Sequence, residues 1–303
     1  MKISEIIRWA KDQGYQFEFV GDETAEIDGF SSLSHYHPGT ITWIKKHIPE
    51  DDELIHSIQC AVIQKGLKAN LANTIISDNS KELFFAILAE FFGGKKHIGG
   101  KRAGTYIGDN VFLDEPVEIG CNCVLDGDIH IGKGTVIEHN VVIMNKVTIG
   151  ENCIIHSGTV IGKDGFGYSF DKENLPVKVK HFGGVLIGNR VEIGANCTVD
   201  RGTIDNTVVG DDVKIDNLVL IAHNAEVGRG TIVVGCTDLA GSSHIGEKTY
   251  IGPQVCVKNQ VSVGDNSFVG MDVMVTESFG DNMMLIKSSS DKPRRNRNYR
   301  RFL

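Results

Sequence analysis

Residues 107–161 read IGDNVFLDEPVEIGCNCVLDGDIHIGKGTVIEHNVVIMNKVTIGENCIIHSGTVI, and this stretch decides the fold. An aliphatic residue returns at every sixth position, at Ile107, Leu113, Ile119, Leu125, Ile131, Ile137, Ile143, Ile149, Ile155 and Ile161. A small or β-branched residue stands four positions after each of the first nine, at Val111, Val117, Cys123, Ile129, Thr135, Val141, Val147, Cys153 and Thr159. A period of six fits neither an ordinary strand nor an amphipathic helix. It is typical of hexapeptide repeats, which form parallel β-helices.

Each hexad can form one short strand followed by a corner. Three strands would close a triangular coil of about 18 residues, and stacked coils would lie about 4.8 Å apart, the hydrogen-bonding distance between strands. The rhythm breaks at 163–186, resumes at Ile187, slips near 204–208 and then continues from Val209 to Val275. About 25 hexads predict roughly eight coils. We therefore expect a mainly β protein whose flat prism faces can pack around a three-fold axis.

The composition narrows the class of protein. A chain of 303 residues is long enough for two domains, and its formal charge of −8 argues against a nucleic-acid binder. The seven cysteines form no CxxC pair, which indicates reduced thiols in a cytoplasmic protein. We expect neither an apolar signal segment nor a transmembrane segment, because no run approaches the roughly 18 apolar residues that span a bilayer.

Three regions are expected along the chain. Residues 1–98 lack the hexad and are predicted to form a small α/β domain, a candidate for uridine binding. Residues 99–280 would form the β-helix, and residues 281–303 would form a short basic tail. Within the first region, helices are predicted near residues 3–13 and 80–92, and strands at 41–44, 60–63 and 74–76. The first helix would bury Ile3, Ile6, Ile7 and Ala10.

Catalytic groups must lie on the outside of such a prism, because its interior is filled. His223 follows the inward Ile221 by two positions and should point outward, and histidine suits general-base work near neutral pH. Asp216 is a candidate to orient His223 or to stabilise its protonated form. Gly241 lies 18 residues after His223, one coil higher, where its backbone N–H could stabilise an oxyanion. A surface histidine and a corner glycine without any role remain the alternative.

The insertion at 163–186 is a second candidate feature. Phe166, Tyr168 and Phe170 alternate in a glycine-rich loop that His181 follows, which indicates a lid or a wall of an apolar groove. Metal chemistry is not expected. A zinc site of this fold would need a histidine a few residues from His223, and Gly228 stands five residues later.

Four motifs are similar to those of a known family: Lys163–Tyr168, Val191–Gly202, Lys214–Asn217 and Ile221–Asn224. In this order and spacing they resemble the UDP-3-O-acylglucosamine N-acyltransferases of bacterial lipid A synthesis. The resemblance covers nearly the whole chain. It implies a left-handed β-helix and a homotrimer with active sites between subunits. It also implies transfer of an acyl group from acyl carrier protein to the 2-amino group of a UDP-sugar, without a metal or other cofactor.

The resemblance also assigns roles to residues. It implies that His223 is the general base, that Asp216 and Asn217 are its polar partners, and that Gly241 is the oxyanion donor. Phe166 and Tyr168 would contribute to substrate binding.

Three positions depart from the family pattern. Gln260 stands where the family often has a second histidine, and Trp43 can stack on uracil but has no aromatic partner within residues 45–48. A basic tail replaces the family's helical extension. Two alternatives therefore stay open: an acyl-CoA-dependent acyltransferase of another nucleotide-linked amino sugar, and a non-catalytic trimeric scaffold that binds nucleotide sugars.

Overall fold

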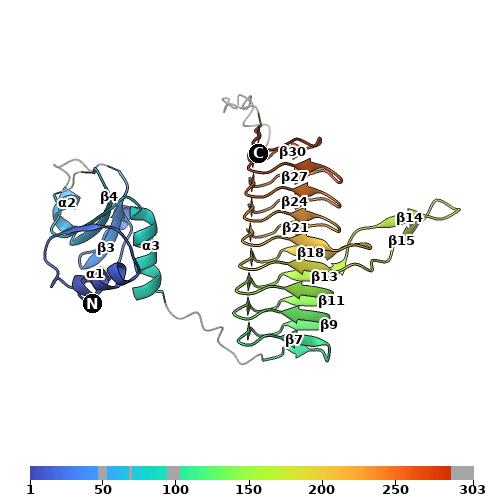
Figure 1. The fold of residues 1–303 in the computed structure, drawn as a ribbon, viewed down its shortest axis with the longest axis horizontal. Helices are drawn as coiled ribbons and strands as arrows, with labels where there is room; N and C mark the ends of the chain where they lie inside the picture. The colour runs from blue at the N-terminus through green and yellow to red at the C-terminus, as the bar shows by residue number, and fades with distance from the viewer. Residues whose placement is uncertain (47–52, 68–69, 94–102, 288–303) are drawn as a thin grey trace, which may run out of the picture. The chain divides into compact units, whose positions relative to one another are not determined.

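The computed structural model describes residues 1–46, 53–67, 70–93 and 103–287. The chain divides into two compact units, Met1–His97 and Ile98–Leu303, which are considered separately (Figure 1). The glycine-rich stretch 93–100, whose composition indicates a linker, lies outside the described residues from residue 94 onward. The tail beyond residue 287 and residues 47 and 48 also lie outside them.

The first unit is a five-stranded sheet with helices. Its strand order is β1-β5-β4-β3-β2, and only β1 runs antiparallel to its neighbour. The elements are α1 (Ile3–Asp12), β1 (Glu18–Val20), β2 (Gly29–Phe30), the 3-10 helix η1 (Leu33–His35), β3 (Thr40–Ile44), α2 (Glu53–Ser57), β4 (Cys60–Gln64), β5 (Thr74–Ser77) and α3 (Ser80–Phe91).

Apolar spacing explains α1. Ile3, Ile6, Ile7 and Ala10 recur at helical intervals and are the residues that α1 buries, as predicted. The helix ends before Gly14, whose φ of +82° suits glycine. The predicted strands and the second helix also occur within one or two residues of their expected bounds.

The second unit is a parallel β-helix. Its first face is a nine-stranded sheet in the order β31-β29-β26-β23-β20-β17-β12-β10-β8. These strands are β8 (Glu118–Ile119), β10 (Val136–Ile137), β12 (Ile154–Ile155), β17 (Glu192–Ile193), β20 (Lys214–Ile215), β23 (Ile232–Val233), β26 (Tyr250–Ile251), β29 (Phe268–Val269) and β31 (Met284–Leu285).

A fifteen-stranded sheet forms the other two faces, because the long strands β9 and β11 continue round a corner and join them. It contains β6 (Tyr106–Ile107), β7 (Val111–Leu113), β9 (Val124–Ile131), β11 (Val142–Ile149), β13 (Val160–Asp164), β16 (Val185–Ile187), β18 (Thr198–Arg201), β19 (Thr207–Val209), β21 (Leu220–Ile221), β22 (Glu226–Val227), β24 (Asp238–Leu239), β25 (His244–Ile245), β27 (Cys256–Val257), β28 (Ser262–Val263) and β30 (Met274–Val275).

The strand register reproduces the predicted rhythm and its two interruptions. Ile137 pairs with Ile155, 18 residues later, as the repeat requires. Ile155 then pairs with Ile193, and Ile193 pairs with Ile215, so these two coils are longer. The longer coils contain the breaks expected at 163–186 and near 204–208.

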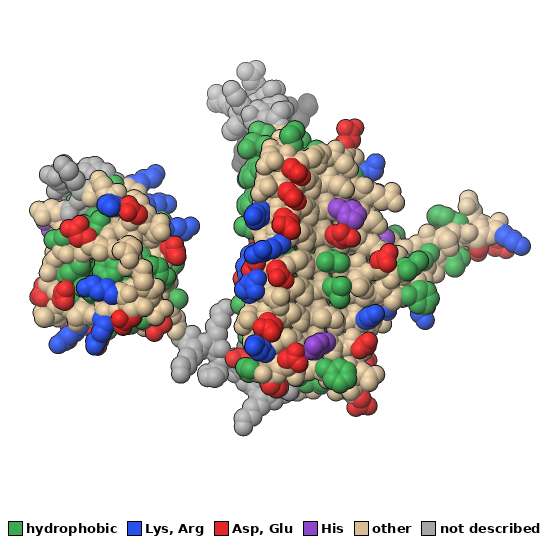
Figure 2. Space-filling model, in the orientation of Figure 1, with side chains coloured by type: hydrophobic (Ala, Val, Ile, Leu, Met, Phe, Trp, Pro, Cys, Tyr) green, Lys and Arg blue, Asp and Glu red, His purple; other side chains and the backbone are tan. Residues whose placement is uncertain are grey.

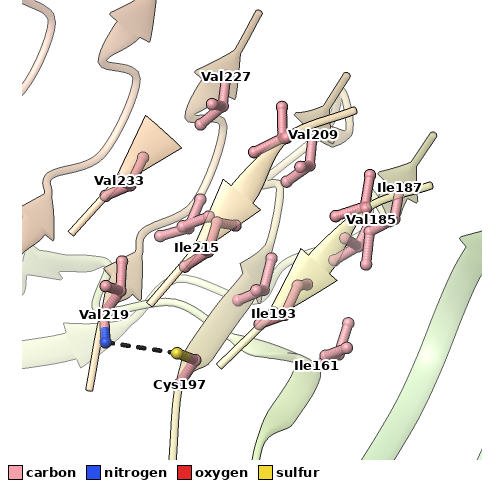
Figure 3. Close-up of a cluster of buried hydrophobic side chains, with 14 of the residues drawn as sticks. Ile161, Val185, Ile187, Ile193, Cys197, Val209, Ile215, Val219, Val227 and Val233 are labelled. Atoms are coloured by element: carbon pink, nitrogen blue, oxygen red, sulfur yellow. Dashed lines mark hydrogen bonds between the residues drawn. The ribbon is translucent and has the colours of Figure 1, made fainter. Parts of the chain in front are cut away.

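The aliphatic residues of the repeat form the core. Their side chains point toward one another inside the prism, as Figure 3 shows for Ile161, Ile193 and Ile215. The position four residues later also faces inward, and Cys197 and Val219 occupy it. Buried thiol and hydroxyl groups at this position form hydrogen bonds with the backbone. For example, the Val219 N–H donates to Cys197 Sγ at 3.5 Å (Figure 3).

The corners require left-handed backbone. One corner is occupied in successive coils by residues with φ values between 54° and 60°: Asn196, Leu218, Cys236 and Gln254. Asparagine tolerates this conformation better than most residues, and the tight corner explains why many of the corners carry Asn, Gly or Asp.

The insertion forms a two-stranded arm. β14 (Tyr168–Phe170) pairs antiparallel with β15 (Pro176–Lys178), and the ribbon projects away from the β-helix (Figure 1). The prediction that this segment is a lid or a wall of an apolar groove stays a prediction. Figure 2 shows apolar side chains along the arm. Phe166 and Phe170 are among the exposed apolar residues of this segment.

None of the helices in the described part of the chain is both long enough and apolar enough to cross a membrane.

Candidate active site

His223 stands at the corner that follows β21, and its ring has a defined tautomer. Its Nδ1 lies 3.2 Å from Asn224 Oδ1. That oxygen also accepts the backbone N–H of Thr203 at 3.0 Å, so its identity as an acceptor is settled. Because the acceptor is an oxygen, His223 Nδ1 must carry the proton when the ring is neutral. The lone pair is then on Nε2, where a general base needs it.

Glycines face the His223 ring from two sides. A Cβ on Gly241 would lie 2.7 Å from both Cε1 and Nε2 of His223. A Cβ on Gly165 would lie 2.8 Å from both Cβ and Cδ2 of His223. Side chains at these two positions would displace the imidazole. Within the described residues the Gly241 N–H donates to no acceptor, so it is available to a ligand.

The base of the insertion adds charged and polar groups. His181 is buried, and its ring centroid lies 5.3 Å from that of His223, in an edge-to-face arrangement. Asp200 of β18 is also buried, and its Oδ1 lies 2.5 Å from Lys163 Nζ. Burial raises the pKa of Asp200 above its ordinary value, against the opposing effect of Lys163. His181 could be noted from the sequence but not assigned a role, and no sequence pattern pointed to Asp200.

Asp216 and Asn217 lie at a different corner, after β20. Asp216 accepts hydrogen bonds from Asn217 Nδ2 at 2.9 Å and from the Gly235 N–H at 3.1 Å. Within one chain Asp216 therefore does not orient His223, whose ring bonds to Asn224 instead. The expectation of an Asp216–His223 pair fails for the single chain because the two residues follow strands of different faces.

Asp216 and Asn217 line a pocket of about 520 Å³ beside this second corner. His156 lies in its wall between two carboxylates, with Nδ1 3.1 Å from Glu138 Oε1 and Nε2 3.0 Å from Glu192 Oε1. The pocket can offer several acceptors to a polar ligand.

Trp43 lines a separate, mainly apolar pocket of about 680 Å³ in the first unit. Its Nε1 donates to Ser80 Oγ at 3.2 Å. Phe85 of α3 stands beside Trp43, with ring centroids 6.1 Å apart. A second aromatic is therefore present, but α3 supplies it from 42 positions along the chain, where a search of neighbouring residues does not find it.

In the part of the chain that the structure describes, neither a hydrogen bond nor a ring contact joins Phe166, Tyr168 or Gln260 to His223. Phe166 is 85% exposed and packs on Tyr168 at 4.9 Å between ring centroids. Gln260 is exposed at the corner one coil above, where its N–H donates to Gly241 O at 3.1 Å.

No three His, Cys, Asp or Glu side chains are arranged to hold a metal ion within the described ranges. All seven cysteines are free.

Similarity to known proteins places this chain in the class of hexapeptide-repeat transferases. Residues 128–163 match the family model described as bacterial transferase hexapeptide (six repeats). The fold resembles two solved structures. A UDP-N-acetylglucosamine O-acyltransferase of Moraxella catarrhalis has a TM-score of 0.56 and 24% identity over 61% of this chain and 70% of that one. A UDP-N-acetylglucosamine acyltransferase of Bacteroides fragilis has a TM-score of 0.54 and 25% identity over 59% and 68%. The β-helix is thus of the left-handed hexapeptide type.

The family follows from a longer match. A UDP-3-O-acylglucosamine N-acyltransferase of Coxiella burnetii is 30% identical over 288 residues, which cover 85% of this chain and 81% of the relative. The chain therefore belongs to the UDP-3-O-acylglucosamine N-acyltransferase family. Other relatives match over a shorter region. The protein of that name from Bordetella avium is 34% identical over 118 residues, about a third of its own length (33%).

Proposed function

We propose that this protein is an N-acyltransferase of lipid A synthesis, which moves an acyl group from a thioester donor to the amino group of a UDP-linked amino sugar. The observation that carries the proposal is the His223 ring. Asn224 accepts its Nδ1–H, Gly241 has no side chain that would clash with its Nε2, and the Gly241 N–H donates to none of the described residues. Family membership supports the substrate class.

In the proposed step, the amine nitrogen attacks the thioester carbonyl carbon, and His223 Nε2 takes a proton from the amine. The negative charge moves to the carbonyl oxygen, which the Gly241 N–H stabilises. The tetrahedral intermediate collapses to the amide, and the C–S bond breaks. The leaving thiolate takes the proton back from the imidazolium ring. No cofactor is needed beyond the phosphopantetheine arm of the donor.

His223→Ala tests this chemistry. We expect transfer to fall by about 10²–10⁴-fold in a product assay with an intact fold. Full activity of the variant would refute the proposed base.

A second experiment identifies the acyl donor. Acyl carrier protein and CoA both present a thioester on a pantetheine arm, so each is supplied in turn with the same UDP-amino sugar. Turnover with acyl carrier protein is the expected result, and turnover with CoA alone would support the alternative acyltransferase. Binding without any product would support the scaffold.

We further propose a homotrimer in which Asp216 and Asn217 of one subunit face His223 of the next. Two features support it. Asp216 and His223 follow strands of different faces, and the nine-stranded face carries outward Ile232, Phe268 and Met284 side chains that solvent reaches in a single chain. Light scattering should give about three times 33.1 kDa.

A mixing experiment tests the shared site. His223→Ala and Asp216→Ala subunits are unfolded, mixed in equal amounts and refolded. If each site uses one residue from each of two subunits, about a quarter of the sites regain both wild-type residues. No recovery would mean that both residues act in the same chain or that Asp216 has no role.

We place Trp43 and Phe85 around the uracil of the substrate, since two aromatic rings line the same apolar pocket. We place the reaction in the cytoplasm, where thiols such as the seven free cysteines stay reduced.

A further inference from the structure

The insertion meets the rest of the β-helix at its base, and there it touches His223. Gly165 and His181 come from the residues that interrupt the repeat, and both lie against the His223 ring. Lys163, at the start of the same segment, pairs with Asp200. The proposed mechanism uses none of them. A segment that served only to project an arm would not need titratable groups at its root.

His181 is a buried histidine with one unused nitrogen. The residue is 1% exposed, and its Nδ1 lies 2.9 Å from the carbonyl oxygen of Val179. A carbonyl only accepts, so Nδ1 carries the proton and Nε2 has the lone pair. Within the described residues Nε2 has no hydrogen-bond partner. A buried acceptor without a donor is costly, and a native protein keeps one where it has a role.

Two glycines of the insertion permit the contact between the histidines. A Cβ on Gly165 would lie 3.1 Å from His181 Nε2 and 2.8 Å from His223 Cδ2. A Cβ on Gly167 would lie 3.0 Å from His181 Cε1. Lys178 of β15 donates to the carbonyl of Gly165 and so ties the arm to this glycine. The backbone of the insertion therefore holds the two rings at their edge-to-face distance.

Asp200 supplies a negative charge on the same side. It is 3% exposed and paired with Lys163, and it directly follows Val199, which pairs with Ile221, two residues before His223. The other charged groups nearby are Lys178 at the insertion and Asp238 on β24, which lies close enough to Asp200 for the two carboxylates to interact. The backbone carbonyl of Asp205 accepts a hydrogen bond from Asn224 Nδ2. Asp200 is thus a buried carboxylate that lies one coil from the His223 corner.

We propose that the base of the insertion is a working part of the active site, in which His181 and the Lys163–Asp200 pair are positioning residues for His223. His181 and Gly165 hold the imidazole against Gly241, and Asp200 stabilises the protonated ring formed during transfer. Lys163 keeps Asp200 ionised in its buried place. This inference rests on the proposed function of His223, and it adds residues that the repeat pattern does not supply.

The first test substitutes His181. We expect His181→Ala to lower kcat by about 10- to 100-fold while KM changes by less than about twofold, because the base is misplaced and the substrate pockets are not. His181→Gln retains a polar side chain of similar length and should recover part of kcat. His244→Ala is the matched control, since His244 lies on the same β-helix and pairs with Glu226 at an exposed site.

The second test removes the charge. Asp200→Asn should move the acid limb of the kcat/KM profile to lower pH by about 0.5 to 1 pH unit, because the protonated ring loses a buried counter-charge. Asp205→Asn, the same change at an exposed carboxylate, should leave the profile unchanged.

A direct readout separates this inference from the proposed function. The ¹⁵N resonances of the His223 ring can be titrated in the wild type, Asp200→Asn and His181→Gln without any substrate. A shifted midpoint in Asp200→Asn and altered ring signals in His181→Gln are expected. Unchanged signals and unchanged kcat in these variants would overturn the inference, even if His223→Ala abolishes transfer. Full activity of His223→Ala would overturn the proposed function and leave the titration result to stand by itself.

Discussion

At the scale of single residues, the site depends on the absence of side chains as much as on their presence. His223 can occupy its corner only because Gly165 and Gly241 have no Cβ. Its useful tautomer depends on Asn224, whose Oδ1 is held by the Thr203 N–H. The base is therefore defined by backbone and amide groups around it, and neighbouring charges then act on a ring whose orientation is already set.

Gly241→Ala tests the role of the missing side chain. The added methyl would stand 2.7 Å from His223 Nε2, so the ring must move away from the Gly241 N–H. We expect a loss of about 10²–10³-fold in kcat, the effect of losing one oxyanion donor, with little change in melting temperature. In Gly280→Ala the added methyl meets nothing within 4 Å, and activity should be unchanged. Equal activity of both variants would show that Gly241 is only a corner residue.

The buried Asp200 carboxyl should make the free energy of unfolding depend on pH. Burial raises its pKa, so the folded state binds the proton more tightly than the unfolded chain. Its favourable contribution is then present below the unfolded pKa and is lost as pH rises through the folded value. Asp200→Asn, which resembles the protonated carboxyl, should be at least as stable as the wild type at pH 7. Its advantage should shrink toward pH 4. Thermal unfolding at both pH values measures this, and a large destabilisation at pH 7 would contradict it.

At the scale of secondary-structure elements, each coil contributes one strand to each face and contacts only its neighbours. Such repeats lose stability locally when a buried residue is cut back. The arm is an exception, because β14 and β15 pair with each other and leave apolar side chains exposed.

Ile137 and Ile221 allow a matched comparison of two coils. Both side chains are fully buried at equivalent positions of the repeat, but only Ile221 directly precedes the His223 corner. Replacement of either by Ala should lower the free energy of unfolding by about 2–4 kcal/mol. At temperatures where both variants are folded, only Ile221→Ala should lose activity. Equal activity losses would show that the whole β-helix, rather than one corner, supports the site.

At the scale of the whole molecule, the reaction of each cysteine with a thiol reagent measures whether the unit that contains it has unfolded. Burial raises the pKa of Cys60 in the first unit to about 12, and it also raises the pKa values of Cys123 and Cys153 in the β-helix. Cys236 is exposed. Because thiolates are the reactive form, we expect Cys236 to react with a thiol reagent in the native state and the buried cysteines to react only on unfolding. Cys236→Ser should remove the fast phase; a fast phase that persists would contradict this assignment.

The sequence by itself determined the β-helix, its core and the corner on which His223 stands. A repeat of fixed period places each residue beside the one about 18 positions away, so regular contacts follow from spacing alone. The helix at residues 3–12 was equally predictable, because its apolar spacing is local.

Only the tertiary structure decided what surrounds His223. His181 and Gly165 reach it through an insertion that has no period, and Phe85 reaches Trp43 from a distant helix. Asp216 is seven positions from His223 in sequence, but the intervening corner assigns the two residues to different faces. The physical reason is that a repeat sets distances along the prism, whereas contacts across an insertion or between elements depend on where the folded chain returns.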